Sequence, residues 1–172
     1  LREDRLVESC DFDQCIAPAA ISGIEKARAG KKSGWDYIDG CMIMALLEIY
    51  STSGDKKYLD FCDYYEDYRI RDDGTIDGYD KNTWNCDELN GGKNLFVLYR
   101  YTNKEKYKKA LDLLYEQVKG QPRTPEGNFW HKQIYPNQVW LDGLYMAQPF
   151  YMEYEKLFNN SKNIEDIYNQ FF

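Results

Sequence analysis

The sequence of 172 residues contains no long run of basic residues, no long run of apolar residues and no CxxC pair of cysteines. Lys and Arg number 22 against 29 Asp and Glu, which gives a net charge of −7 and no basic stripe that follows a phosphate backbone. The longest purely apolar run, Cys41 to Leu47, is far shorter than the roughly 18 residues of a membrane-spanning helix. We therefore expect neither a nucleic-acid partner nor a membrane partner.

An export signal is also missing, because no basic segment followed by an apolar one stands at the amino terminus. We therefore expect a soluble, cytoplasmic protein, unless such a signal has been removed. The chain starts at Leu1 and ends with Phe171 and Phe172, an apolar end that another segment would ordinarily cover. We expect the front half of a larger protein.

The five cysteines form an odd set, so neither a disulfide framework nor a zinc or redox motif is indicated. The acidic segment 72–80 lacks the spacing and the closing Glu of a calcium-binding EF-hand, and we expect a solvated loop there. The sequence therefore predicts no metal and no cofactor. The thiols expected to be reduced and structural are Cys10, Cys15, Cys41, Cys62 and Cys86.

Aromatic residues, in contrast, are abundant and make up 16% of the chain, with 16 Tyr and 4 Trp. Aromatic rings are suited to large buried contacts and to stacking against the apolar faces of sugar rings. The segment 129–150 concentrates two Trp, the only His and an Asp at the start of an apolar helix. This composition favours a carbohydrate ligand.

A helix-pair unit recurs along the chain. The segment 50–58 (YSTSGDKKY) is echoed 49 residues later by 99–107 (YRYTNKEKY), and each segment joins an apolar helix to an amphipathic one. A third pair is expected over about 138–171, with a kink or a division at Pro149. The first helix of each pair is apolar nearly all round and the second on one face, as the inner and outer layers of a helical array require. The sequence thus predicts one all-α domain over 1–172, built of three helical hairpins.

Asp142 stands at the start of the third apolar helix, flanked by Trp140, Leu141 and Tyr145, so we expect it to be at least partly buried. Such surroundings disfavour the charged form of a carboxyl group, as a general acid near neutral pH requires. The alternative is an aspartate that caps the amino end of the helix. Spacing alone leaves both interpretations open.

Asp87 stands at the corresponding start of the second apolar helix, and Trp35 precedes the first. Equivalent helix ends in such an array point to one side, so we expect Asp87 and Asp142 to face a common cleft, with Trp35 on the same rim. The alternative for Asp87 is a first-turn acid matched to the helix dipole. His131 and Lys132 both offer donors to the carboxylate of an acidic sugar, although a lone His is often structural.

Two blocks of sequence carry a family resemblance. The segment Trp130 to Phe150, with its Trp-x-Asp-Gly motif at 140–143, and the segment Trp84 to Lys93 are similar to glycoside hydrolase family 105, the unsaturated rhamnogalacturonyl hydrolases. The resemblance implies an (α/α)6 barrel of six inner and six outer helices, of which this chain would form about half. It also implies metal-free removal of terminal 4,5-unsaturated galacturonyl units from pectin fragments, with an unsaturated acidic oligosaccharide as the partner.

By this resemblance Asp142 is the proton donor and Asp87 a second acidic residue close to the substrate. The residues predicted to bind the substrate are basic or aromatic and lie near the helix starts: His131, Lys132, Trp140, Trp35 and Trp84. The later Trp and Arg residues that complete the family's pocket have no counterpart in this chain.

Two other classes of function stay open at this point. One is another (α/α)-barrel glycoside hydrolase that cleaves an ordinary glycosidic bond with two carboxylates. The other is a non-catalytic helical-repeat module that binds sugars.

Overall fold

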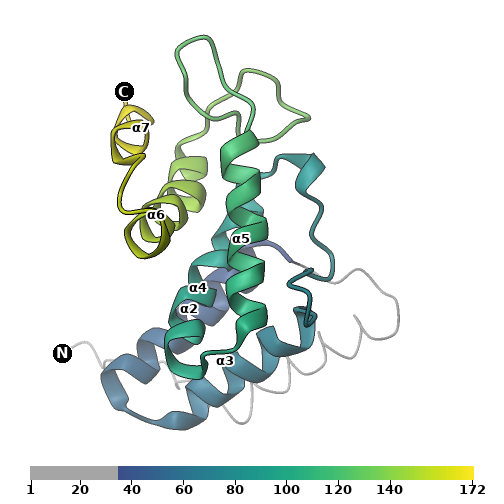
Figure 1. Ribbon diagram of the computed structural model, residues 1–172, viewed down its shortest axis with the longest axis vertical. Helices are drawn as coiled ribbons and strands as arrows, with labels where there is room; N and C mark the ends of the chain where they lie inside the picture. The colour runs from purple at the N-terminus through teal and green to yellow at the C-terminus, as the bar shows by residue number, and fades with distance from the viewer. Residues whose placement is uncertain (1–34) are drawn as a thin grey trace, which may run out of the picture. The chain divides into compact units, whose positions relative to one another are not determined.

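The computed structural model describes residues 35–172, whose regular structure is helical apart from two isolated pairs of bridged residues. Six α-helices form three consecutive pairs (Figure 1). They are α2 (Tyr37–Ser53) and α3 (Lys56–Arg69), α4 (Cys86–Thr102) and α5 (Glu105–Gly120), and α6 (Leu141–Phe158) and α7 (Ile164–Asn169), with a short 3-10 helix η2 (Lys81–Thr83) before α4. The predicted all-α class and hairpin array are confirmed for this part of the chain.

The expectations about the whole chain can be compared with the structure only over residues 35–172. Residues 1–34 lie outside the described residues, and with them Cys10 and Cys15, so the single domain over 1–172 stays a prediction. Within 35–172, no helix combines the length and the apolarity that crossing a bilayer requires. The three cysteines placed there are free thiols, and burial raises the pKa of both Cys62 and Cys86 to about 12, as expected of structural thiols.

Helix α4 forms the centre of the inner layer, because it packs against both α2 and α6 (Figure 1). Helix α3 packs against α2, and α5 packs against α4, as the outer helix of each pair should. The two inner helices α2 and α4 approach closely at Gly40, where an added Cβ would lie 2.9 Å from the backbone nitrogen of Gly91. The inner helices therefore form the layer whose amino-terminal ends carry the candidate site.

Gly40→Ala is expected to lower the free energy of unfolding by about 1–3 kcal/mol, because the added methyl group forces α2 and α4 apart. Its nearest neighbour would be Asn90 Nδ2 at 2.7 Å. Chemical denaturation followed by circular dichroism measures the change, and Ile38→Ala, at a position of α2 that is 60% exposed, is the control. An unchanged midpoint for Gly40→Ala would contradict the close approach of the two helices.

The repeated connectors share one backbone geometry. Gly54 and Asn103, 49 residues apart, both adopt the left-handed conformation, with φ of 71° and 53°. Their N–H groups donate to the carbonyls of Tyr50 and Tyr99 at 2.8 and 2.9 Å, which closes the end of each inner helix. Gly and Asn are the residues that tolerate this conformation best. The sequence repeat therefore specifies the turn between the helices of a pair.

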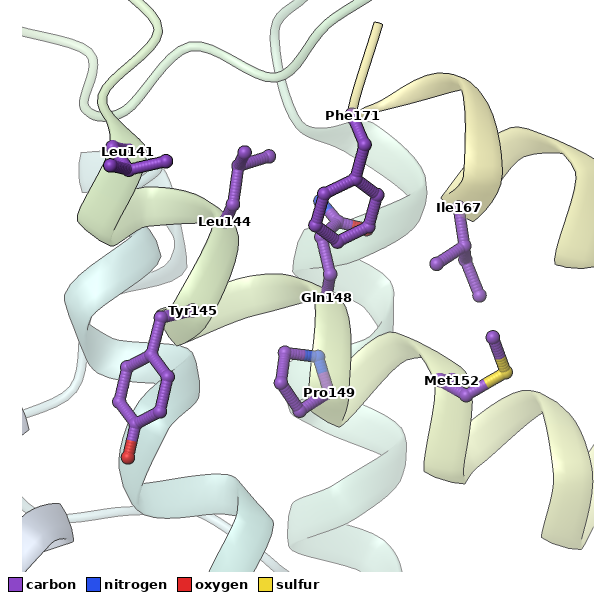
Figure 2. Close-up of a pocket in the computed structure, with 8 residues that line it drawn as sticks. All are labelled: Leu141, Leu144, Tyr145, Gln148, Pro149, Met152, Ile167 and Phe171. Carbon is purple, nitrogen blue, oxygen red and sulfur yellow. The ribbon is translucent and has the colours of Figure 1, made fainter.

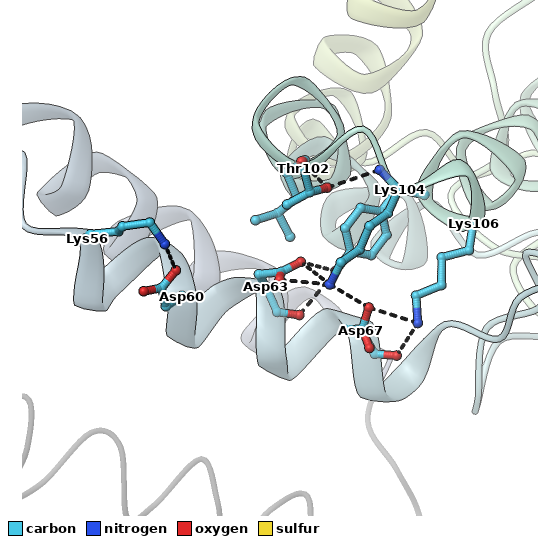
Figure 3. Close-up of polar contacts among 9 residues, drawn as sticks. Lys56, Asp60, Asp63, Asp67, Thr102, Lys104 and Lys106 are labelled. Atoms are coloured by element: carbon cyan, nitrogen blue, oxygen red, sulfur yellow. Dashed lines mark hydrogen bonds and ion pairs between the residues drawn. The ribbon is translucent and has the colours of Figure 1, made fainter.

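A charged cluster ties α3 to the start of α5 (Figure 3). The ammonium group of Lys104, directly before α5, donates to Asp63 at 2.8 Å and to Asp67 at 2.7 Å. The Tyr107 hydroxyl donates to Asp63 at 2.6 Å, and the Lys106 ammonium donates to the backbone carbonyl of Asp67 at 2.7 Å. The first hairpin is therefore joined to the second by polar contacts as well as by the inner layer.

Pro149 lies inside α6, which is continuous over Leu141–Phe158, so of the two predicted outcomes, a kink or a division, the division is wrong and the kink stays a prediction. Because Pro149 has no N–H, the carbonyl of Tyr145, four residues earlier, lacks its helical donor. The Lys93 ammonium of α4 donates to this carbonyl at 3.2 Å and lies 3.8 Å from the centre of the Tyr145 ring. Burial lowers the pKa of Lys93 to about 8. A lysine side chain thus replaces the missing backbone bond and fastens α6 to α4.

Candidate active site

Three polar side chains meet where the inner helices α4 and α6 begin. Asp87 is the second residue of α4, Asp142 is the second residue of α6, and His131 comes from the loop before α6. One ligand atom of each lies within 4.8 Å of those of the other two. Trp35 is tied to the same end, since its indole N–H donates to the carbonyl of Glu88 at 2.8 Å. The predicted rim of helix starts is confirmed.

The first turns of the two helices position the carboxylates. Helix α4 is capped by Asn85, whose side chain accepts from the Asp87 N–H at 3.0 Å. Helix α6 follows Trp140 without a side-chain cap, so the interpretation of Asp142 as the capping residue is wrong. Both acids lie in a first turn, where the helix dipole favours negative charge.

Asp87 is 7% exposed and contacts two residues of the loop before α6, His131 and Lys132. Its Oδ2 is 2.7 Å from Lys132 Nζ, and its Oδ1 is 3.5 Å from His131 Nε2. Because the pair with Lys132 is largely buried, salt screens it less than it would a surface pair. Lys132 therefore holds the Asp87 carboxylate in place and offsets its charge.

His131 is 2% exposed, and its ring is stacked on Trp140 with centroids 4.3 Å apart and planes 8° apart. The backbone fixes the same residue, since its N–H donates to the Gln138 carbonyl at 2.8 Å and its carbonyl accepts from the Cys86 N–H at 3.0 Å. Burial lowers the pKa of His131, and the nearby carboxylates oppose this shift without reversing it. The imidazole is therefore neutral at neutral pH, with its Nε2 toward Asp87.

Asp142 is exposed, so the expectation that its apolar neighbours bury it is wrong. The reason is that those neighbours are exposed themselves: Leu141 is 85% exposed and Tyr145 is 49% exposed. They line the open side of α6 and do not fold over the carboxyl group. Asp142 is therefore the member of the cluster that is open to a ligand.

Residues 18–172 match the family model described as Glycosyl Hydrolase Family 88. The chain belongs to this family. It is also similar to a solved structure of a glycoside hydrolase from family 105 of C. acetobutylicum ATCC 824, with 43% identity over 90% of this chain and a TM-score of 0.78. The resemblance inferred from 130–150 and 84–93 is thus confirmed. The chain covers 43% of that structure, so it spans less than half of the length of the protein it matches.

The tryptophans of this family 88 chain are not all placed as predicted. Trp140 is 38% exposed and lies at the cluster, over His131. Trp35 is 5% exposed and packs against α4, so the prediction that its ring meets the substrate is not supported by its position. The Trp84 ring lies against Gly120 at the end of α5, where an added Cβ would be 2.7 Å from it. Of the three, only the Trp140 ring is stacked within the cluster and also exposed.

Two residues near the cluster were not assigned from the sequence. Glu88 is 9% exposed, and burial raises its pKa to about 7, while the Thr83 hydroxyl donates to it at 3.3 Å. Tyr135 extends the stack, with its ring 5.1 Å from that of Trp140 and the planes 17° apart. The position of Glu88 next to Asp87 in the sequence could have indicated that Glu88 lies near the cluster. The contact of Tyr135 with Trp140 could not be predicted, because it depends on the path of a loop that has no periodic pattern.

An apolar groove lies beside the cluster rather than in it. It has a volume of about 560 Å³ and follows the exposed side of α6 and α7, as Figure 2 shows. Apolar side chains dominate its lining, with Leu144, Met152 and Ile167 among them. An apolar groove of this kind does not suit a charged sugar, so we place the candidate active site at Asp87, His131 and Asp142.

Proposed function

We propose that the protein removes 4,5-unsaturated galacturonyl residues from rhamnogalacturonan or pectin oligosaccharides by hydrating their vinyl ether double bond, with Asp142 as the general acid. The observation that carries the proposal is the meeting of an open carboxyl group, Asp142, with a paired one, Asp87, at two neighbouring helix starts. The family and the similarity to a family 105 glycoside hydrolase support the reaction class. Because the chain spans under half of that structure, we propose this activity for a complete protein of that relative's length, and the activity tests below use such a protein.

The chemistry requires one proton and one water molecule. In a 4,5-unsaturated uronide, a proton from Asp142 adds to C4, which leaves a cation at C5 that the ring oxygen stabilises. Water adds to C5 and gives a proton back to the Asp142 carboxylate, and within this proposal Asp87 orients this water. The resulting hemiketal opens and releases the remaining sugar, so no covalent bond to the protein forms. A bound sugar would cover the exposed Asp142 carboxyl group and exclude water from it.

The separation of the carboxyl groups argues against an ordinary inverting hydrolase. Such enzymes keep their two carboxyl groups about 6.5–9.5 Å apart, so that a water molecule fits between them. The ligand oxygens of Asp87 and Asp142 are within 4.8 Å of each other. This spacing is below the inverting range but close to the about 5–5.5 Å of retaining enzymes, so it disfavours an inverting mechanism and leaves a retaining one to the absorbance test below.

The exposure of each side chain indicates which residues can contact the substrate. Trp140 is 38% exposed, so the part of its ring that His131 and Tyr135 leave uncovered offers an apolar contact for the sugar. The His131 side chain is 1% exposed, so within this proposal it supports Trp140 and Asp87 instead of meeting the uronate. Lys132, with 24% of its side chain exposed, is the donor that a uronate carboxylate can reach while Lys132 stays on Asp87. A cytoplasmic location remains part of the proposal.

Lys132→Met is expected to raise KM for the unsaturated oligosaccharide about tenfold or more, because a charge-assisted hydrogen bond to the uronate is lost. Steady-state kinetics on the complete protein separate this from a change in kcat. Lys156→Met, at an exposed lysine near the end of α6, is the control. A fall in kcat with KM unchanged would show that Lys132 serves Asp87 alone.

Absorbance tests the reaction itself. Loss of the ultraviolet absorbance of the conjugated double bond, on incubation with unsaturated oligosaccharides, would support hydration. New reducing ends without that loss would indicate hydrolysis of an ordinary glycosidic bond. Binding of the oligosaccharide with neither signal would indicate a non-catalytic module, and both of these results would contradict the proposal.

A further inference from the structure

The three residues that meet at the helix starts have the spacing of a metal site. In a tetrahedral zinc site with bonds of about 2.0–2.2 Å, neighbouring ligand atoms stand about 3.4 Å apart. His131 Nε2 and Asp87 Oδ1 are 3.5 Å apart, and Asp142 brings a third ligand atom within 4.8 Å. Because Asp142 is exposed, its side chain has room to rotate toward the other two ligands. We propose that Asp87, His131 and Asp142 bind Zn²⁺, with water as the fourth ligand.

The imidazole supplies an observation independent of the acids. His131 is 2% exposed, and its Nδ1 has no hydrogen-bond partner among the described residues. Its Nε2 is directed at Asp87 over 3.5 Å, longer than a normal hydrogen bond of 2.7–3.2 Å. Stacking on Trp140 and backbone bonds on both sides hold the ring in this orientation. The ring is therefore held with Nε2 toward Asp87 but farther from it than a normal hydrogen bond, which leaves Nε2 preorganised as a ligand atom.

The charges and donor types favour zinc over the hard cations. Lys132 occupies Asp87 Oδ2 at 2.7 Å and leaves Oδ1 for the ion. Two carboxylates and one ammonium leave a net negative charge that a divalent cation neutralises. Magnesium and calcium prefer six or more oxygen ligands, whereas an imidazole nitrogen with two carboxylate oxygens suits zinc.

The surroundings of the second ring nitrogen of His131, Nδ1, limit the affinity for zinc. A metal-bound histidine usually donates its other ring N–H to an acceptor, and loss of such a partner costs about 10–100-fold in metal affinity. Nδ1 of His131 has no such acceptor, and it faces Gly143, where an added Cβ would lie 2.9 Å from it. We therefore expect micromolar binding of an inhibitor, not a resident cofactor. Inhibition by zinc rests on the proposed function, because the ion would occupy the oxygens of Asp142 that donate the proton. Binding of zinc does not rest on the proposed function.

The single histidine of the chain makes the test direct. In isotopically labelled protein the ring nitrogens of His131 give one set of magnetic-resonance signals, and zinc chloride should shift the Nε2 signal saturably without any substrate. Asp142→Asn removes an anionic ligand from an exposed position and should weaken zinc binding at least about tenfold. Glu126→Gln removes the same charge from an exposed loop residue and should leave binding unchanged.

Cysteine thiols also bind zinc, so the titration is repeated on protein whose accessible thiols, such as that of Cys41, have been alkylated. Unchanged affinity after alkylation, together with weaker binding in Asp142→Asn, would support the site. No shift of the His131 signals at saturating zinc, or equal affinity in Asp142→Asn and the wild type, would overturn it. Since no oligosaccharide is present, failure of the proposed hydrolysis leaves this result unaffected.

Discussion

Asp142→Asn is expected to lower kcat by at least about 10²-fold in the complete protein, the usual scale of general acid catalysis. The amide has the shape of the acid but carries no transferable proton, so the double bond at C4 stays unprotonated. Because Asp142 is exposed and caps no helix, the substitution should leave the fold and the binding of the oligosaccharide unchanged. The rate of loss of the double-bond absorbance at saturating substrate gives kcat.

Glu126→Gln is the matched control, since it neutralises one exposed acid in the loop between α5 and α6 that is not part of the cluster of Asp87, His131 and Asp142. It should retain wild-type turnover. If Asp142→Asn also turns over at a near-normal rate while circular dichroism shows it folded, the proton donor is not Asp142. Asp87 would then be the next residue to test, or the hydration mechanism would have to be abandoned.

Glu155→Leu is expected to lower the free energy of unfolding by at least about 3 kcal/mol, because it leaves several buried donors without an acceptor. Glu155 is 0% exposed and joins α6 to the turn that leads into α7. It accepts from the Tyr115 hydroxyl, from Asn159 Nδ2 at 2.8 Å, and from the backbone and side chain of Asn163 at 2.9 and 3.0 Å. Urea denaturation measures the loss.

The pH dependence of this contribution has a definite sign. Burial opposes the charged form of Glu155, but the hydrogen bonds outweigh it and hold its pKa below the usual range. The stabilisation is therefore fully present above the pKa of the unfolded chain and is lost as the pH falls through the folded value. Glu155→Leu should lose less stability than the wild type on acidification, whereas Glu165→Gln, at an exposed position of α7, should follow the wild type.

The sequence predicted the helical pairs because their cause is local. The segments 50–58 and 99–107 carry both the change in apolar pattern and the residues, Gly54 and Asn103, that adopt the left-handed turn. The meeting of Asp87 and Asp142 follows from the same regularity, since both occupy the second position of an inner helix. Periodicity therefore fixed which helix ends lie together.

The exposure and partners of individual side chains depended on contacts distant in the sequence. Lys132 lies on Asp87, 45 residues earlier, through a loop whose path no periodic pattern describes. Asp142 was expected to be buried because its neighbours are apolar, but apolar neighbours bury a carboxyl group only when they are themselves covered. Trp35 was expected to meet a ligand, whereas its indole N–H is taken by a backbone carbonyl of α4.

The contact between Lys93 and the Tyr145 carbonyl couples the residue at position 93 to the residue at position 149. With proline at position 149, the Tyr145 carbonyl accepts a hydrogen bond from Lys93. With any other residue at position 149, the backbone N–H of that residue would compete for the same oxygen. The partly buried lysine would then keep the cost of its burial and lose its acceptor. Residues 93 and 149 are therefore expected to change as a pair during divergence of the family, although they lie on different helices.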